Sequence, residues 1–184
     1  SIDAAVRGGA RRVVFSSSAF AIGYSHACSG PQAFAPRYLP IDEAHGALPH
    51  ETYGLSKLCG EHVLEAAAQT AKSTSFVSLR FPNIIKSENW ATLPWDPPTV
   101  DSPMTFLLWA YAAEDDVIDA HVQAAMRPDA ASSGSHEAYI IAAHDTRFAE
   151  PTMDLLGTVG LGESDVPLRQ AMQGNASPLD SSKA

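Results

Sequence analysis

A short apolar strand is the feature that most constrains the fold of this chain. Val13, Val14 and Phe15 form a continuous apolar run that starts soon after Gly8-Gly9 and ends in three serines. Such a run, short and without alternation, is typical of a strand buried on both faces in a parallel sheet. Parallel strands are joined by crossover connections, usually helices. The sequence therefore favours an α/β fold.

The neighbouring segments agree with that class. A helical pattern over residues 2–9 ends at the glycine pair, another covers residues 52–69, and residues 74–81 alternate as a strand. Residues 23–50 are rich in Gly, Pro and Ser and predict a long loop, which in a compact domain is usually functional or disordered. The order of these elements predicts a doubly wound parallel sheet.

Beyond residue 81 the pattern becomes irregular. We expect strands at 104–111 and 137–144, and helices at 114–126 and 150–160. In the first of these helices the inward face would carry Val117, Ala120, His121 and Ala124. We therefore predict two domains: residues 1–81, and a smaller irregular α+β lobe over residues 82–184.

Composition narrows the class of function. The 184 residues carry a net charge of −9, and 45% of them are hydrophobic, as in a globular protein. An acidic chain lacks the cationic footprint of nucleic-acid binding.

No apolar run reaches the roughly 18 residues of a membrane span. Cys28 and Cys59 cannot form a disulfide framework, which favours a reducing, cytoplasmic location. The histidines form no metal-ligand motif, so no metal site is expected.

The helix at 52–69 has two different faces. Its apolar side chains (Leu55, Leu58, Cys59, His62, Val63 and Ala66) predict a core stripe, with Cys59 as a small core residue. Tyr53 and Lys57, four residues apart, lie together on the opposite side with Gly60. An interior glycine costs roughly 1 kcal/mol relative to alanine and is tolerated where something approaches the backbone closely. A bare Tyr-Lys pair is otherwise an ordinary exposed face.

The chemistry of the pair suggests a site. A phenol is a useful acid or base near neutral pH only where its anion is stabilised, and a nearby ammonium does this. Ser16, Ser17 and Ser18 follow the buried strand, and ligands of open α/β sheets bind beyond the carboxyl ends of strands. Serines also end strands for ordinary reasons, so they become informative only together with the Tyr-Lys helix.

The segments "RRVVFSSSAFAIG", "PIDE", "YGLSKLCGE" and "LRFPNII", in this order, resemble the extended short-chain dehydrogenase/reductase family, in its NAD-dependent epimerase/dehydratase branch. The resemblance implies a Rossmann-like fold, with Tyr53 as catalytic acid/base. Lys57 would be its partner and bind the nicotinamide ribose, and Ser18 would be the catalytic hydroxyl that also contacts substrate. Ser16 and Ser17 would run along the cofactor, NAD or NADP.

The resemblance also implies a place for the substrate. Pro82 would lie beside the nicotinamide and Asn83 beside the substrate, which in this family is often a nucleotide-sugar. The segment between Ser18 and Tyr53 suggests an insertion near the substrate, with Arg37 and Tyr38 as further contacts. Relatives pair through the Tyr-Lys helix, so a homodimer is expected, to which Leu64 and Ala67 would contribute.

One part of the family pattern is absent from the sequence. The glycine-rich turn that seats the pyrophosphate at a helix N-terminus is not found, and "GTVGLG" at 157–162 follows a helical pattern rather than a strand. With no initiator Met and an abrupt tail, the chain is expected to be a fragment of a longer enzyme. The alternative is a truncated, non-catalytic relative that acts as a binding or interaction module.

Overall fold

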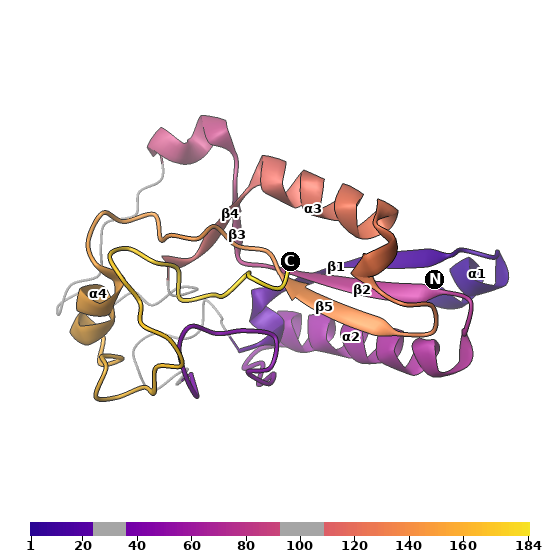
Figure 1. Ribbon diagram of the computed structural model, residues 1–184, viewed down its shortest axis with the longest axis horizontal. Coiled ribbons are helices and arrows are strands. Elements are labelled where there is room, and N and C mark those ends of the chain that lie inside the picture. The colour runs from indigo at the N-terminus through magenta and orange to yellow at the C-terminus, as the bar shows by residue number, and fades with distance from the viewer. Residues whose placement is uncertain (24–35, 93–108) are drawn as a thin grey trace.

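A parallel sheet forms the centre of the molecule. The computed structural model describes residues 1–23, 36–92 and 109–184. Strands β1 (Arg12–Ser18), β2 (Ser75–Phe81) and β5 (His136–Ile140) pair in the order β1-β2-β5, all parallel (Figure 1). The predicted α/β class is confirmed.

A second, two-stranded sheet lies at the end of the first. It consists of β3 (Asn83–Ile85) and β4 (Tyr111–Ala113), which are parallel. The strand expected at 104–111 falls mostly outside the described residues, and β4 begins where that expectation ended. Short 3₁₀ turns follow β1 at Ala19–Ala21 and β3 at Ser87–Thr92.

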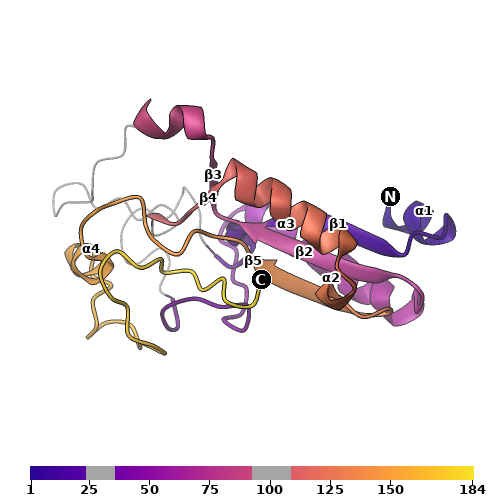
Figure 2. The same ribbon diagram turned by 45° about the horizontal axis from the view of Figure 1, so that its top comes forward.

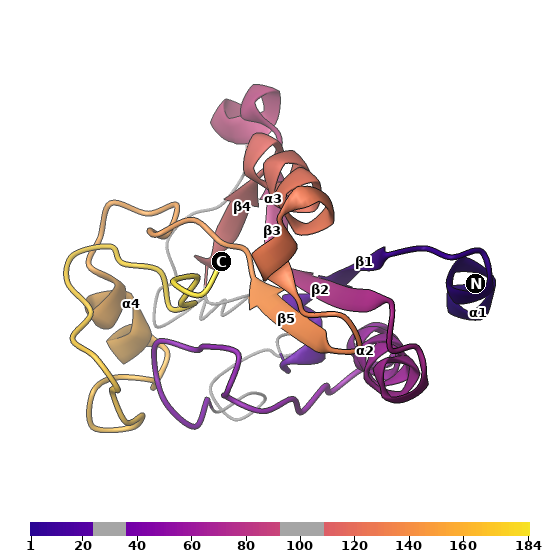
Figure 3. The same cartoon turned by 45° about the vertical axis from the view of Figure 1, so that its right-hand side comes forward.

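Helices cover both faces of the central sheet. Helix α1 (Ile2–Arg7) leads into β1, α2 (Thr52–Thr70) packs on one face, and α3 (Glu114–Met126) packs on the other (Figure 3). Side chains of β2 alternate between them: Phe76 packs with α2, whereas Val77 and Leu79 pack with α3. The inward face predicted for α3 is confirmed, because Ala124 is buried and its three predicted neighbours are partly buried.

The predicted core stripe of α2 is wrong. Leu55 and Val63 are 50% and 52% exposed, and Cys59 is exposed as well. The buried residues are Gly54, Glu61, Leu64 and Ala68, on the side that also carries Lys57. The helix therefore packs through a mixture of small, polar and apolar residues, and its most apolar stripe faces outward.

Two glycines explain why this side of α2 packs inward. A Cβ built on Gly54 would overlap the carbonyl oxygen of Phe20, and one built on Gly60 would overlap the ring of Phe15. The close approach foreseen for Gly60 is thus made by a neighbouring side chain of β1. Glycine lets the helix axis come near the strand, so that short side chains reach the sheet.

A separate core lies beyond the carboxyl end of the sheet. It joins Leu39, Ile41 and Trp109 to the segment around α4 (Thr152–Thr158). Backbone bridges pair Leu39 with Leu168 and Ile41 with Leu179, so the loop after β1 lies along the C-terminal segment (Figure 2).

Strand β5 belongs to the central sheet, although it lies far beyond the predicted domain boundary in the sequence. The division at residue 82 placed it in the second lobe, yet it pairs with β2 in the central sheet. Its last residue, Ile140, belongs to the separate core, and the Ile140 N–H donates to Glu43 Oε1 at 2.7 Å. The sheet is thus not confined to residues 1–81. The assignment of one lobe to cofactor and the other to substrate stays a prediction.

Candidate active site

The carboxyl ends of β1 and β2 lie side by side. Ser18, the last residue of β1, is in register with Phe81, the last residue of β2. Buried Pro82 and partly exposed Asn83 therefore follow β2 directly beside the serines. The structure thus brings Ser18, Pro82 and Asn83 to one edge of the sheet, where open α/β folds bind ligands.

Tyr53 reaches this edge from the start of α2. Glu51 caps the helix, and its Oε2 accepts a hydrogen bond from the Tyr53 N–H at 2.6 Å. The phenol is 49% exposed and packs edge-on against Phe20, with 5.6 Å between ring centroids. Within the described ranges its hydroxyl has no hydrogen-bond partner. It is therefore accessible to a ligand.

Phe20 connects Tyr53 with Ser18. The Phe20 N–H donates to Ser18 Oγ at 3.2 Å, while its ring contacts that of Tyr53. Ser18 is 7% exposed and caps the 3₁₀ turn that follows β1. This turn fixes the hydroxyl at the strand end and accounts for its burial.

Lys57 is held between the strand and the phenol. Its Nζ donates to the carbonyl oxygen of Ser16 at 2.8 Å. The same ammonium lies 5.4 Å from the ring centroid of Tyr53 and 5.3 Å from that of Phe15. The strand backbone thus holds a positive charge beside an exposed phenol, as the i, i+4 spacing predicted.

His121 was expected to be a core residue, but it makes specific polar contacts. Its Nε2 lies 2.8 Å from Ser16 Oγ, its Nδ1 lies 2.8 Å from the carbonyl oxygen of Val117, and its ring stacks on Phe81. A carbonyl only accepts, so Nδ1 donates to Val117, and Nε2 is left to pair with the Ser16 hydroxyl. Helix α3 is thereby tied to the strand residue that holds Lys57.

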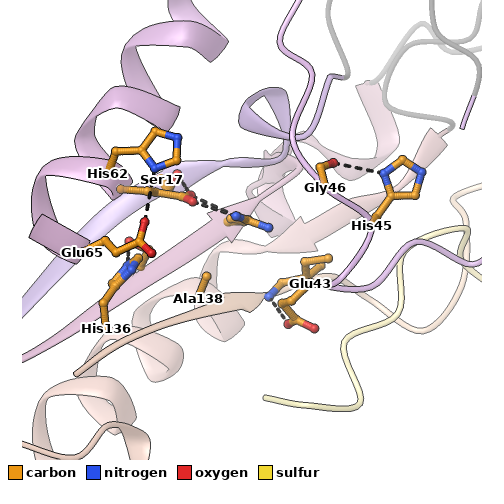
Figure 4. Close-up of polar contacts among 12 residues, drawn as sticks. Ser17, Glu43, His45, Gly46, His62, Glu65, His136 and Ala138 are labelled. Carbon is orange, nitrogen blue, oxygen red and sulfur yellow. Dashed lines mark hydrogen bonds and ion pairs between the residues drawn. The ribbon is translucent and has the colours of Figure 1, made fainter. Parts of the chain in front are cut away.

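Ser17 points to a buried ion pair that the sequence analysis did not identify. Its hydroxyl donates to Glu61 Oε1 at 2.5 Å (Figure 4). Arg80 donates to both carboxylate oxygens, from Nε at 3.0 Å and from Nη2 at 2.7 Å. Ser17 is 4% exposed, so it faces α2 rather than a ligand. Arg80, a charged residue within the otherwise uncharged strand "SFVSLRF", was the available signal.

Arg37 and Tyr38 lie in the loop beside the C-terminal segment. Arg37 is exposed, whereas Tyr38 is 8% exposed and donates to Asp42 Oδ1 at 2.6 Å. The guanidinium of Arg169 covers the Tyr38 ring at 3.4 Å. Burial, followed by the contact with Asp42, raises the pKa of Tyr38 to about 12. Its hydroxyl is thus committed to Asp42, and the substrate contacts proposed for both residues stay predictions.

The comparisons with known proteins agree with this geometry. A model of the NAD dependent epimerase/dehydratase family matches residues 2–89, the range that contains β1, α2 and β2. The match to the family model is confined to this range. The resemblance read from the sequence is thus confirmed. A search of the curated proteins found no match.

Several solved structures share the fold of nearly the whole chain. A short-chain dehydrogenase/reductase superfamily protein from Agrobacterium tumefaciens with bound NAD has 18% identity and a TM-score of 0.62, covering 99% of this chain and 62% of its own. The NAD complex of Thermus thermophilus UDP-glucose 4-epimerase has 19% identity and a TM-score of 0.53, with 99% and 59% covered. The chain thus spans about 60% of the length of these proteins.

A third structure contains a sugar nucleotide. It is UDP-N-acetylglucosamine 4-epimerase from Methanobrevibacter ruminantium in complex with UDP-N-acetylmuramic acid, with 16% identity and a TM-score of 0.57, covering 99% of this chain and 58% of that one. At these identities the likeness is one of fold.

Proposed function

We propose that this chain carries out, or forms the catalytic part of an enzyme for, NAD(P)-dependent epimerase/dehydratase-type oxidoreductase chemistry on a nucleotide-sugar. The observation that carries the proposal is the exposed Tyr53 phenol beside the anchored Lys57 ammonium, at the carboxyl edge of a parallel sheet. Both residues lie in the segment that matches the family model.

The residues at this edge fit the nicotinamide-ribose end of NAD or NADP. Lys57 uses one donor on Ser16 and has two further donors for ribose hydroxyls. Pro82 and Asn83 border the same edge. Among the strands of the described ranges, none leads through a glycine-rich turn into a helix, so the fit is limited to this end of the cofactor.

Each residue of the set has a distinct role in the proposed mechanism. When bound, NAD or NADP would supply the hydride acceptor and donor of the reaction. Tyr53 takes the proton of a substrate hydroxyl as the carbonyl forms, and returns it in the reverse step. Lys57 stabilises the negative charge on the Tyr53 oxygen, while Ser18 orients the substrate oxygen by a hydrogen bond. Asn83 is placed to contact the sugar.

The proposal is tested by adding NAD or NADP and a panel of UDP-sugars to the purified 184-residue chain. Sugar interconversion is followed by NMR, and net oxidation by the absorbance of the reduced cofactor. Turnover of one UDP-sugar that depends on the cofactor is the expected result. Binding of both ligands without turnover would contradict it and favour the non-catalytic binding module.

We further propose that two copies pair along α2. Leu55 and Val63 are half-exposed on its outer side, and they lie next to the exposed Cys59. Leu64, named above as a dimer contact, is 1% exposed within the chain and contacts its own core instead. Light scattering should show a dimer that Leu55→Asp converts to a monomer; a monomeric unmodified chain would refute the pairing.

A further inference from the structure

Glu61 links every element that carries a proposed catalytic group. It lies on α2, one turn after Lys57 and two turns after Tyr53. Its Oε1 accepts from Ser17 of β1, and both of its oxygens accept from Arg80 of β2. Ser17 and Arg80 are themselves paired in the register of the two strands. The Glu61 carboxylate thus joins α2 to β1 and β2 at one pair of residues that lie opposite each other, Ser17 and Arg80.

The position of this contact along β1 affects the hydrogen bond of Lys57. Ser17 lies between Ser16, whose carbonyl oxygen accepts from Lys57, and Ser18, the proposed catalytic hydroxyl. A shift of α2 along β1 would move Lys57 away from Ser16 and Tyr53 away from Ser18. The contact between Glu61 and Ser17 opposes that shift, because it fixes one turn of the helix to the strand residue between the two groups.

The free energy of the Glu61–Arg80 ion pair also suggests that the pair orients the helix rather than merely stabilising its contact with the sheet. Glu61 is 4% exposed, and the side chain of Arg80 is 11% exposed. Removing two charges from water has a cost that the attraction between them often only balances, so apolar residues would hold the helix equally well. Apolar packing lacks direction, however, whereas a two-pronged guanidinium–carboxylate contact fixes both distance and orientation.

The remaining contacts of α2 leave this role open to Glu61. Gly54 and Gly60 allow close approach to Phe20 and Phe15 but donate no directional side-chain bond. Leu64 and Ala68 pack against Phe76, again without direction. His136 on β5 pairs with Ser78, with 2.8 Å between Nε2 and Oγ, and is not a partner of the ion pair.

We propose that Glu61, paired with Arg80, is a positioning residue that sets the register of α2 on β1 and thereby holds Lys57 on the Ser16 carbonyl. This inference rests on the proposed function, in which Lys57 serves Tyr53. It assigns no contact with substrate or cofactor to Glu61.

The test measures the Lys57 contact directly and needs no enzyme activity. In the chain labelled with ¹⁵N at lysine Nζ, a hydrogen-bonded ammonium that exchanges slowly gives its own NMR signal, assigned with Lys57→Arg. Glu61→Gln removes the charge that holds Arg80 and should abolish this signal while the chain remains folded by circular dichroism. Glu65→Gln, the same change at an exposed carboxylate one turn further on, should leave the signal unchanged.

A double variant separates positioning from stability. Glu61→Met with Arg80→Met removes both charges and leaves no buried charge unpaired. It should fold but lose the Lys57 signal. A folded double variant that keeps the signal would overturn the proposal, and so would loss of folding in both Glu61 variants, which would assign the pair to stability alone. The proposed function is tested separately in the unmodified chain. If that chain shows the Lys57 signal but no turnover, the result counts against the proposed function and not against the positioning role of Glu61.

Discussion

At the scale of single residues, the site combines exposed and buried polar groups with different tasks. Tyr53 and Lys57 are accessible, whereas Ser17, Glu61 and Arg80 are buried and bonded to one another. Tyr53 and Lys57 can contact a ligand, and the buried contacts of Glu61 hold these two side chains in position.

Two histidines, the buried His45 and the partly buried His136, should make stability depend on pH. Burial lowers the pKa of His136, despite the opposing effect of nearby Glu61 and Glu65, and burial also lowers the pKa of His45. Below the unfolded value of 6.5 the unfolded chain therefore binds more protons than the folded chain. Their contribution to the free energy of unfolding is fully present above about pH 6.5 and is lost as the pH falls.

Urea unfolding at several pH values measures this effect. His136→Gln should make the decline of stability below about pH 6.5 shallower, because one of the two groups no longer titrates. His144→Gln, the same change at an exposed position, should leave the slope as it is. If the His136→Gln variant and the unmodified chain lose stability with the same slope, His136 has no part in the pH dependence.

At the scale of elements, the contact of α2 with β1 depends on its glycines. Gly54→Ala should destabilise the chain by about 2 kcal/mol, since the new methyl group meets a backbone carbonyl that cannot rotate away. Thermal or urea unfolding measures the change.

Gly157 in α4 is the matched control for Gly54. Nothing lies within 4 Å of a Cβ built there. Gly157→Ala should therefore leave stability unchanged or raise it by up to about 1 kcal/mol, through helix propensity alone. A neutral Gly54→Ala variant would argue against the close approach of α2 to the turn after β1.

The helices and strands were largely predictable, but the faces of α2 were not. Apolar runs and glycine ends indicated α1, β1, α2 and β2 within one or two residues. A count of apolar side chains placed Leu55 and Val63 inward, but both are half-exposed. The actual packing depends on an ion pair with Arg80, 19 residues away, and such a partner cannot be derived from helical periodicity.

The site was predictable to a similar extent. The spacing of Tyr53 and Lys57 and the serines after β1 placed these groups at one edge of the sheet. The involvement of His121 was missed, because its partner Ser16 lies 105 residues away on another element. Long-range polar contacts of this kind arise from the fold and leave no local pattern.

At the scale of the whole molecule, the two regions are joined through β5. Without β5 and α3, the α3-facing side of β2 would expose Val77, Leu79 and Phe81 to water. A chain cut after residue 81 should therefore lack cooperative thermal unfolding, because that apolar face is uncovered. Circular dichroism of residues 1–81 measures this. A sharp melting transition would show that residues 1–81 fold on their own and would contradict this prediction.

The described residues contain no helix that is both long and apolar enough to cross a membrane. They also contain no group of three or more His, Cys, Asp or Glu side chains placed to hold a metal ion.

The central claim is that Tyr53 is the acid/base of a cofactor-dependent reaction. The most direct measurement is kcat for conversion of the UDP-sugar substrate by Tyr53→Phe, with Tyr139→Phe as a control that loses a hydroxyl donating to the Ala130 carbonyl oxygen. We predict a fall of about 100-fold or more for Tyr53→Phe with cofactor affinity retained, and at most a small change for the control. Unchanged turnover in Tyr53→Phe would contradict the account.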